Sequence, residues 1–211
     1  MSCSIILFDI DGTLVESGGA GRRSFVRVFH ELLGIPDAFD GYSFSGTTDK
    51  QIIRDAYKTH FKRDPSELEM AEAERAYVER LGGELEIARN LGTVGVYPGV
   101  HSLLDALDSL GVTYGLATGN FVEGARMKLE LHGLWHRFPF GGFGSDHEHR
   151  GEMTAIAVRR GLERLGQPTD NDDIWVIGDS PLDIQAARYA GVRILSVCTG
   201  LHAMQALSSL N

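Results

Sequence analysis

The sequence predicts an α/β protein: a doubly wound, Rossmann-like parallel sheet core with an inserted α-helical cap domain. Two observations support this fold class. Short apolar runs alternate with amphipathic helical patterns, which is the order expected of a parallel sheet covered by helices on both faces. Between the first and second apolar runs lies a long stretch, residues 15–94, with mainly helical patterns. An insertion of that length needs packing of its own, so we expect it to form a separate domain.

Four aliphatic runs predict the strands of the core sheet. They cover residues 5–8, 112–117, 174–177 and 194–197. Each run is short and lacks alternating polar positions, which is typical of parallel strands buried on both faces.

Helical patterns fill the segments between these strands. They cover residues 100–110, 121–132, 152–165 and 182–190, and a short helix is expected over 201–210. A glycine follows each of the first four patterns, and glycine is the residue favoured just beyond a helix end.

The inserted segment contains two helix starts. Thr48 with Gln51, and Ser66 with Glu69, have the spacing of capping boxes. Glycines at both ends of the insertion suit a hinge. The resulting assignment is residues 1–15 and 95–211 for the core and residues 16–94 for the helical cap.

The composition argues against several classes of partner. The 211 residues carry a formal net charge of -9, so neither nucleic acid nor an anionic membrane surface is an expected partner. Two cysteines, Cys3 and Cys198, are too few for a disulfide framework. The sequence shows no signal peptide and no apolar run of the ~20 residues that a membrane span needs. We expect a cytoplasmic protein that is a monomer or a homodimer.

Acidic residues follow the first and third predicted strands. Asp9 and Asp11 end the first, and Asp179 and Asp183 follow the third. Ligands of open parallel sheets bind at the carboxyl ends of the strands, so these four residues should meet at one edge. Carboxylates gathered in a partly dry cleft repel one another unless a cation neutralises them, and all-oxygen ligation suits Mg²⁺. The alternative for Asp179 and Asp183 is that they cap the helix that follows.

Thr118, Gly119 and Asn120 follow the second strand. A hydroxyl and backbone donors at the start of a helix form a ready anion site, so these residues are candidates for phosphate binding. The alternative for Thr118 is a plain N-cap.

These segments together resemble the haloacid dehalogenase superfamily. The sequence DIDGT at residues 9–13 is similar to its first motif, Thr118 to its second, and GDSPLD at residues 178–183 to its fourth. GTTD at residues 46–49 and YPGV at residues 97–100 resemble segments of its helical-cap subfamily, which includes phosphoglycolate phosphatase and β-phosphoglucomutase. The resemblance covers nearly the whole chain.

The resemblance implies Mg²⁺-dependent phosphoryl transfer through an aspartyl-phosphate. Asp9 would be the nucleophile and, with Asp11, Asp179 and Asp183, would make up the metal site. Asp11 would protonate the leaving alcohol and then take a proton from the hydrolytic water. Gly12 would permit the turn behind these acids and help to bind the phosphate. A second aspartate argues against a dehalogenase, because a halide leaving group needs no acid.

The third motif departs from the family pattern. The family usually places a lysine between the second and fourth motifs, but no lysine occurs after Lys128, and Arg150 is the positional substitute. The alternative for Arg150 is a surface ion pair with Asp146 or Glu148. The sequence DHEH at residues 146–149 also resembles a zinc site, although mixed ligands on such a loop are more often solvated.

Arg22 and Arg23, just behind the first motif, are candidates for recognising a distal anionic group on the substrate. The alternative is that both are solvated. Our leading hypothesis is a Mg²⁺-dependent phosphatase that acts on a small phosphorylated metabolite. A phosphosugar mutase on the same scaffold and a non-catalytic module that binds a phosphometabolite are the alternatives.

Overall fold

Five parallel strands form the central sheet of the computed structural model, which describes residues 4–210. The strand order is β5-β4-β1-β6-β7. The strands are β1 (Ile5–Phe8), β4 (Thr113–Thr118), β5 (Gly141–Phe143), β6 (Ile174–Gly178) and β7 (Arg193–Ser196). Because β1 pairs with both β4 and β6, Leu7 lies opposite Gly115 on one side and Val176 on the other. The predicted α/β fold with a parallel sheet is confirmed.

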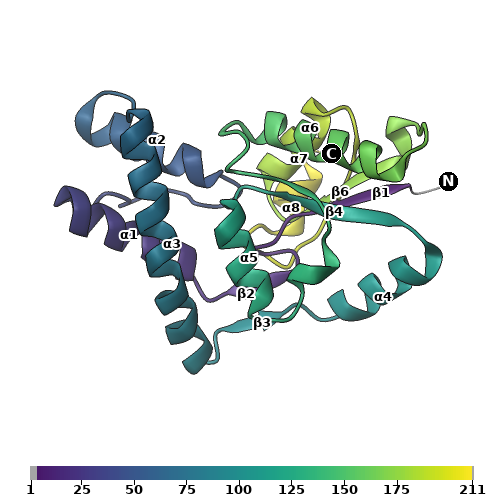
Figure 1. The fold of residues 1–211 in the computed structure, drawn as a ribbon, viewed down its shortest axis with the longest axis horizontal. Helices are drawn as coiled ribbons and strands as arrows, with labels where there is room; N and C mark the ends of the chain where they lie inside the picture. Colours follow the sequence, from purple (N-terminus) through teal and green to yellow (C-terminus); the bar gives the residue numbers. More distant parts are fainter. Residues whose placement is uncertain (1–3, 211) are drawn as a thin grey trace.

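Helices cover both faces of this sheet (Figure 1). They are α4 (Val100–Leu110), α5 (Val122–Glu130), α6 (Arg150–Leu165), α7 (Pro181–Tyr189) and α8 (Met204–Ser208), with 3-10 turns at Trp135–Arg137 and Asn171–Asp173. Ile6 and Phe8 of β1 pack with side chains of α4 and α5, whereas Ile5 and Leu7 pack with side chains of α6 and α7. Successive side chains of a strand point to opposite faces, so this short strand is buried on both.

Three more helices form a unit beside the sheet (Figure 1). This helical unit consists of α1 (Ala20–Leu33), α2 (Asp49–Phe61) and α3 (Glu67–Asn90). It has a hydrophobic core of its own, in which the rings of Phe25 and Tyr77 stack at 4.2 Å, and Phe121 of the sheet domain joins that core. The chain enters and leaves the unit through an antiparallel pair, β2 (Val15–Ser17) and β3 (Val94–Val96).

The predicted caps lie at the starts of α2 and α3. The Thr48 hydroxyl accepts a hydrogen bond from the backbone N–H of Gln51. Ser66 and Glu69 form a reciprocal capping box. Both arrangements satisfy backbone donors that the first helical turn leaves without a partner.

Several elements differ from the sequence prediction, which did not contain the short strands β2 and β3. Strand β5 was not predicted, because its Gly-Gly-Phe sequence is no aliphatic run; it forms through pairing with the neighbouring β4. Helix α6 begins at Arg150 instead of residue 152, which brings that arginine into the first turn. The last helix, α8, has 5 residues and is shorter than the predicted 201–210.

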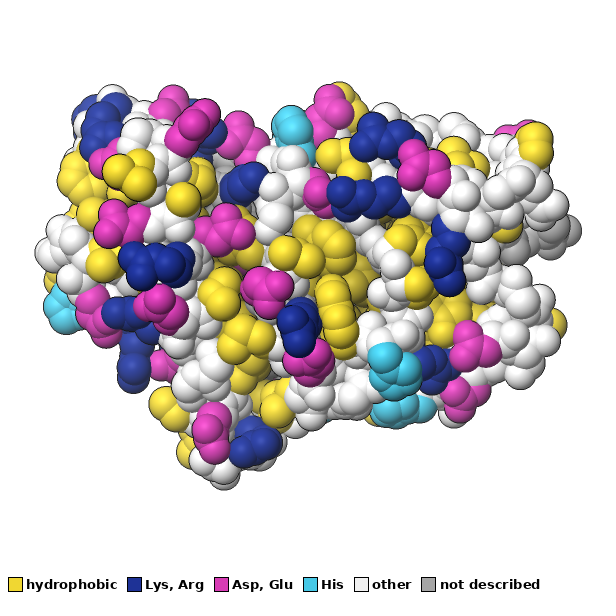
Figure 2. All heavy atoms as spheres, in the orientation of Figure 1, with side chains coloured by type: hydrophobic (Ala, Val, Ile, Leu, Met, Phe, Trp, Pro, Cys, Tyr) yellow, Lys and Arg dark blue, Asp and Glu magenta, His cyan; other side chains and the backbone are white. Residues whose placement is uncertain are grey.

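Within residues 4–210, no helix has the length and apolar character that crossing a bilayer requires. Figure 2 shows acidic and basic side chains interspersed over the face that it presents. This face therefore carries no large patch of a single charge.

Candidate active site

A cavity of about 510 Å³ lies at the carboxyl ends of the strands, between the sheet and the helical unit. Asp9, Asp11 and Asp179 line it from the sheet side, and Phe25 and Tyr77 line it from the helical unit. We call it the main cavity. Its position is the one at which open parallel sheets bind ligands.

Asp9 lies directly after β1, and its side chain is buried. Its backbone N–H donates to the carbonyl of Ile177 at 2.9 Å, and its Oδ2 lies 3.0 Å from Nη2 of Arg150. Burial raises the pKa of Asp9 to about 6; the positive charge of Arg150 opposes this rise, and the carboxylate of Asp183 adds to it. A carboxylate held beside a guanidinium in a cavity wall is well placed to act as a nucleophile.

Asp9, Asp179 and Asp183 form an acidic trio, with ligand oxygens that lie within 4.8 Å of one another. Burial, followed by repulsion from Asp9 and Asp183, raises the pKa of Asp179 to about 7. Burial and mutual repulsion thus both disfavour the ionised form of these carboxyl groups when no cation is bound. A hard divalent cation such as Mg²⁺, which prefers oxygen ligands, fits this donor set.

Within the trio, Asp183 has the most hydrogen bonds. Its Oδ2 accepts from the backbone N–H of Ser180 at 3.0 Å and from the Ser180 hydroxyl at 2.7 Å. Its Oδ1 accepts from Nε and Nη2 of Arg150. Asp183 thus completes a capping box at the start of α7 and orients Arg150, which leaves Asp9 and Asp179 as the better candidates for direct contact with a cation.

The carboxylate of Asp11 is not part of the trio. Its Oδ1 accepts from the hydroxyl of Ser17 at 2.5 Å, and its Oδ2 accepts from Nζ of Lys128 at 2.6 Å and from Nδ2 of Asn120 at 2.9 Å. Burial alone would raise the pKa of Asp11, but the charge of Lys128 and these hydrogen bonds outweigh burial and lower it. The predicted grouping of all four acids around one cation therefore does not occur through their side chains.

Lys128 was not predicted as a site residue. Its side chain extends from α5, is only 6% exposed, and donates to Asp11 and to Oδ1 of Asn120, at 2.6 Å in each case. The sequence did contain a signal: Phe121, just before α5, and Ala125 and Lys128 within it recur at helical spacing and are buried. A lysine on such a face needs a partner.

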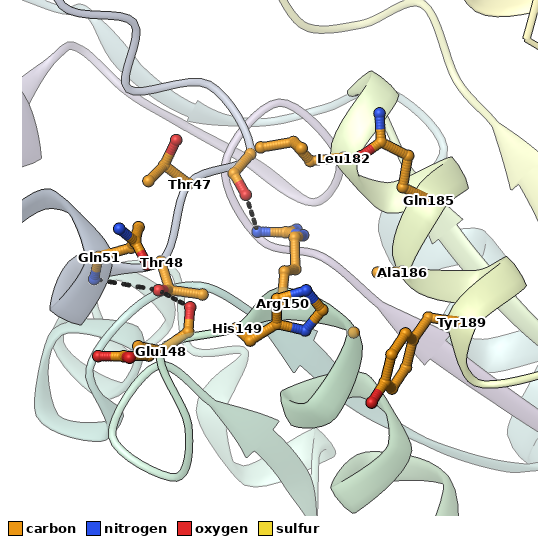
Figure 3. Close-up of a pocket in the computed structure, with 12 residues that line it drawn as sticks. Thr47, Thr48, Gln51, Glu148, His149, Arg150, Leu182, Gln185, Ala186 and Tyr189 are labelled. Atoms are coloured by element: carbon orange, nitrogen blue, oxygen red, sulfur yellow. Dashed lines mark hydrogen bonds between the residues drawn. The ribbon is translucent and has the colours of Figure 1, made fainter. Parts of the chain in front are cut away.

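Arg150 reaches the site from the first turn of α6 and is buried. The carboxylates of Asp183 and Asp9 outweigh its burial and raise its pKa, so it stays charged. Its Nη1 also donates to the carbonyl of Gly46 at 2.9 Å. Figure 3 shows this bond at the wall of a second cavity, of about 350 Å³, on the other side of Arg150.

The alternative partners of Arg150 are bound elsewhere. Asp146 pairs with Arg160 at 2.7 Å, and Glu148 pairs with Arg54 at 2.6 Å. In the same loop, His149 caps the start of α6. Among the described residues, DHEH contributes no member to a group of three converging metal ligands.

The loop after β4 lies against the first motif. The Thr118 hydroxyl is fully buried and accepts from Nδ2 of Asn120 at 2.8 Å, so Thr118 supports the loop and does not line the main cavity. Gly119 does line it, and a Cβ on Gly119 would lie 2.9 Å from Nη1 of Arg150. Gly12 has a positive φ of 80°, and a Cβ there would lie 2.5 Å from Oδ2 of Asp179. Both glycines are needed because side chains cannot fit.

The two candidate arginines, Arg22 and Arg23, differ in whether they reach the main cavity. Arg22 lines the main cavity, with its guanidinium 5.7 Å from the ring centre of Phe44. Arg23 does not line it: its Nε pairs with the buried carboxylate of Glu84 at 2.6 Å, and its Nη1 donates to the carbonyl of Gly18. Glu84 lies 61 residues further along the chain, so the sequence pattern could not reveal this pairing.

Asp49, which was not predicted, joins the helical unit to the loop after β4. Its backbone N–H donates to the carbonyl of Gly119 at 2.7 Å, and its Oδ2 accepts from the backbone N–H of Phe121 at 2.8 Å. Phe121 is the N-cap residue of α5 and has no capping side chain, so Asp49 holds the start of α5 through this backbone N–H, from the opposite side of the main cavity. Thr199, after β7, also contacts the site by donating to the carbonyl of Gly12.

Known proteins share both this sequence pattern and this fold. A family model described as haloacid dehalogenase-like hydrolase matches residues 6–197. The chain belongs to the haloacid dehalogenase-like hydrolase family. The resemblance recognised in the motifs is thereby confirmed, and the chain is an enzyme of this hydrolase family.

Individual members of the haloacid dehalogenase-like family are distant relatives. A phosphoglycolate phosphatase from Rhodospirillum rubrum is 27% identical, over 92% of this chain and 79% of its own length. A pyrophosphatase, PpaX from Bacillus velezensis, is 27% identical over 97% of this chain and 87% of its own. The crystal structure of CbbY from Rhodobacter sphaeroides in complex with phosphate has a TM-score of 0.67 at 23% identity, covering 95% of this chain and 89% of that one. At that identity, the structural likeness shows the fold alone.

Proposed function

We propose that the protein is a Mg²⁺-dependent phosphatase that hydrolyses a small phosphorylated metabolite through an aspartyl-phosphate intermediate. The observation that carries the proposal is the arrangement around Asp9. Its carboxylate faces Asp179 and the guanidinium of Arg150, while Asp11 lies in the same cavity but points to a different set of partners. Two carboxylates in distinct environments suit two distinct tasks.

In the first step, an oxygen of Asp9 attacks phosphorus, and the bond between phosphorus and the ester oxygen breaks. Asp11 gives its proton to the departing oxygen, so the product leaves as an alcohol. The low pKa of Asp11 means that it must gain this proton when the substrate binds. The negative charge of a bound phosphate ester raises the pKa of Asp11 and so favours uptake of this proton from solvent.

In the second step, Asp11 is ionised and takes a proton from water. The hydroxide that forms attacks phosphorus, and the bond to Asp9 breaks, which releases inorganic phosphate and restores the nucleophile. Arg150 keeps its charge throughout and offsets negative charge near the phosphoryl group.

Asp9 and Asp179 would hold the Mg²⁺ ion, with Asp183 acting through Arg150. The ion would supply positive charge that offsets the repulsion of the nucleophile and the phosphate. The backbone at Gly12, next to Asp11, lies close to the Asp179 carboxylate and so borders the proposed metal site.

The substrate proposal rests on the main cavity and its lining. The helical unit covers the strand ends, so the cavity suits a small metabolite better than a phosphorylated protein. Arg22 lines it without a carboxylate partner among the described residues, and would bind a distal anionic group. We also propose that residues 16–94 form a cap that opens and closes over this cavity. The low cysteine content suits a reducing compartment, so we place the protein in the cytoplasm.

The test is release of inorganic phosphate from p-nitrophenyl phosphate, then from a panel of phosphorylated metabolites, with and without Mg²⁺. We expect turnover that depends on Mg²⁺ and that Asp9→Asn abolishes. Equal phosphate release by the wild type and Asp9→Asn would remove the proposal.

A further inference from the structure

Lys128 is a buried cation next to the residue that we assign to proton transfer. It comes from α5, a helix that contributes none of the four sequence motifs, and its side chain reaches the wall of the main cavity. Its ammonium lies 2.6 Å from Oδ2 of Asp11 and 2.6 Å from Oδ1 of Asn120. These are the polar groups that its nitrogen contacts directly among the described residues.

Packing alone does not explain a lysine at this position. Its neighbours on α5, Ala125 and Leu129, are fully buried in a hydrophobic cluster. Moving an ammonium group out of water is unfavourable unless it is well paired, and replacement of buried ion pairs by apolar residues is often neutral or stabilising. A lysine here is therefore better explained by what it does to Asp11.

The contacts hold the Asp11 carboxylate from two directions. On one side, Ser17 of β2 donates to Oδ1; on the other, Lys128 and Asn120 donate to Oδ2. Asn120 is itself fixed, because its oxygen accepts from Lys128 and its Nδ2 also donates to Thr118. Without Lys128, Asp11 would lose its only contact with a cation among the ion pairs of residues 4–210.

We propose that Lys128 is a positioning residue that holds the Asp11 carboxylate in the orientation from which it meets the leaving-group oxygen. The inference rests on the proposed phosphatase function and adds a residue to it. Lys128 acts through Asp11, so its loss should affect the steps that need proton transfer and spare the attack by Asp9. A displacement of a catalytic group by about 1 Å can reduce a rate by about 10²-fold.

Two substrates of nearly the same shape separate these effects. p-Nitrophenyl phosphate releases a stable phenolate that needs little protonation, whereas phenyl phosphate releases a more basic one. We expect Lys128→Met to lower kcat/KM, which reports on the first step and not on hydrolysis of the intermediate, about tenfold more for phenyl phosphate than for p-nitrophenyl phosphate. Asp11→Asn should show the same preference. In the Asp11→Asn background, Lys128→Met should reduce neither rate further.

The matched control is Met127→Ala, which loosens the adjacent position of α5, where the side chain packs on the core of the helical unit and does not contact Asp11. It should change both rates by the same factor. If Lys128→Met fails to fold, Lys128→Gln takes its place. It keeps a hydrogen-bond donor and removes the charge, so we expect the same preference with a smaller ratio.

The outcomes distinguish the inference from the function on which it rests. If Lys128→Met lowers both rates equally, or lowers them further in the Asp11→Asn background, the positioning role is wrong and the phosphatase proposal stands. If the wild type hydrolyses neither substrate faster than Asp9→Asn, both are wrong. If Asp11→Asn lowers both rates equally, Asp11 transfers no proton to the leaving group and the positioning role is excluded.

Discussion

Arg150 connects three parts of the site at a single residue. Its guanidinium contacts Asp9, Asp183 and the carbonyl of Gly46, and a lysine could not reproduce these directions with one nitrogen. Each hydrogen bond to a charged group contributes about 1.5–3 kcal/mol. We expect Arg150→Lys to lower the free energy of unfolding by about 2 kcal/mol, as measured by urea denaturation.

A matched control for this substitution is Arg160→Lys. Arg160 pairs with Asp146, but its side chain is 37% exposed, so solvent screens the pair. We expect Arg160→Lys to change the free energy of unfolding by less than about 1 kcal/mol. Equal losses in the two variants would show that burial of Arg150 adds nothing to its interactions.

Gly12 illustrates how a residue without a side chain shapes the site. Gly12 and Gly34 both have a left-handed backbone, but a Cβ would meet Asp179 at Gly12 and open space at Gly34. We expect each alanine variant to lose about 1–2 kcal/mol of stability from the left-handed strain. Only Gly12→Ala should also displace Asp179 and reduce phosphate release. Full activity of Gly12→Ala at saturating Mg²⁺ would contradict this account.

At the scale of elements, the start of α2 and the start of α5 hold the two sides of the main cavity together. Asp49, the first residue of α2, accepts from the backbone N–H of Phe121 and donates its own N–H to Gly119. Burial raises the pKa of Asp49 to about 7 from an ordinary value of 3.8, against the opposing charge of Lys128. Folding therefore favours the protonated form of this carboxyl group.

This shift gives a pH prediction for Asp49→Asn. The stability contribution of a raised carboxyl pKa is fully present below the unfolded value and is lost as pH rises through the folded value, about 7. Asparagine keeps the acceptor for Phe121 but does not titrate. We expect the melting temperature of Asp49→Asn, relative to wild type, to rise by about 3 °C or more between about pH 5.5 and about pH 8.5. A constant difference across this range would mean that Asp49 does not titrate there.

The elements that the sequence predicted are those with a local pattern. Strands β1, β4, β6 and β7 have aliphatic runs, and a glycine follows shortly after the end of each of α4, α5, α6 and α7. Strand β5 has no such run: it depends on β4 for pairing and on α6 for packing, since a Cβ on Gly142 would lie 2.3 Å from the carbonyl of Met153. A local sequence pattern does not predict such contacts between segments far apart in the chain.

The same division applies to the candidate site. The sequence predicted that Asp9, Asp179 and Asp183 lie at one edge of the sheet, because each follows a strand and the end of a strand can be recognised locally. The partners of Lys128 and Arg23 are set by tertiary packing: Lys128 meets Asp11 at a separation of 117 residues. A single sequence contains no signal for such pairs beyond a charged residue on a buried face.

At the scale of the whole molecule, hydrogen bonds join the helical unit to the sheet side. Residues 45–54 of the helical unit bind the sheet side through several bonds, including Ser45 with His202, Thr48 with the carbonyl of Glu148, and Asp49 with Gly119. The covalent connections run only through β2 and β3 within the described chain. We propose that these bonds open when a substrate enters the main cavity, while the hydrophobic cores on either side stay intact.

Binding of Mg²⁺ at the acidic trio should stabilise the whole fold, because a ligand that binds only the folded state shifts unfolding by mass action. At a concentration about 100 times the dissociation constant, the gain is about 2.7 kcal/mol, which raises the melting temperature by several degrees. We expect this rise in the wild type and its loss in Asp179→Asn. Asp105→Asn is the matched control, because Asp105 is exposed and pairs with Arg137 outside the site. If Mg²⁺ raised the melting temperatures of wild type and Asp179→Asn equally, the ion would bind somewhere other than the trio.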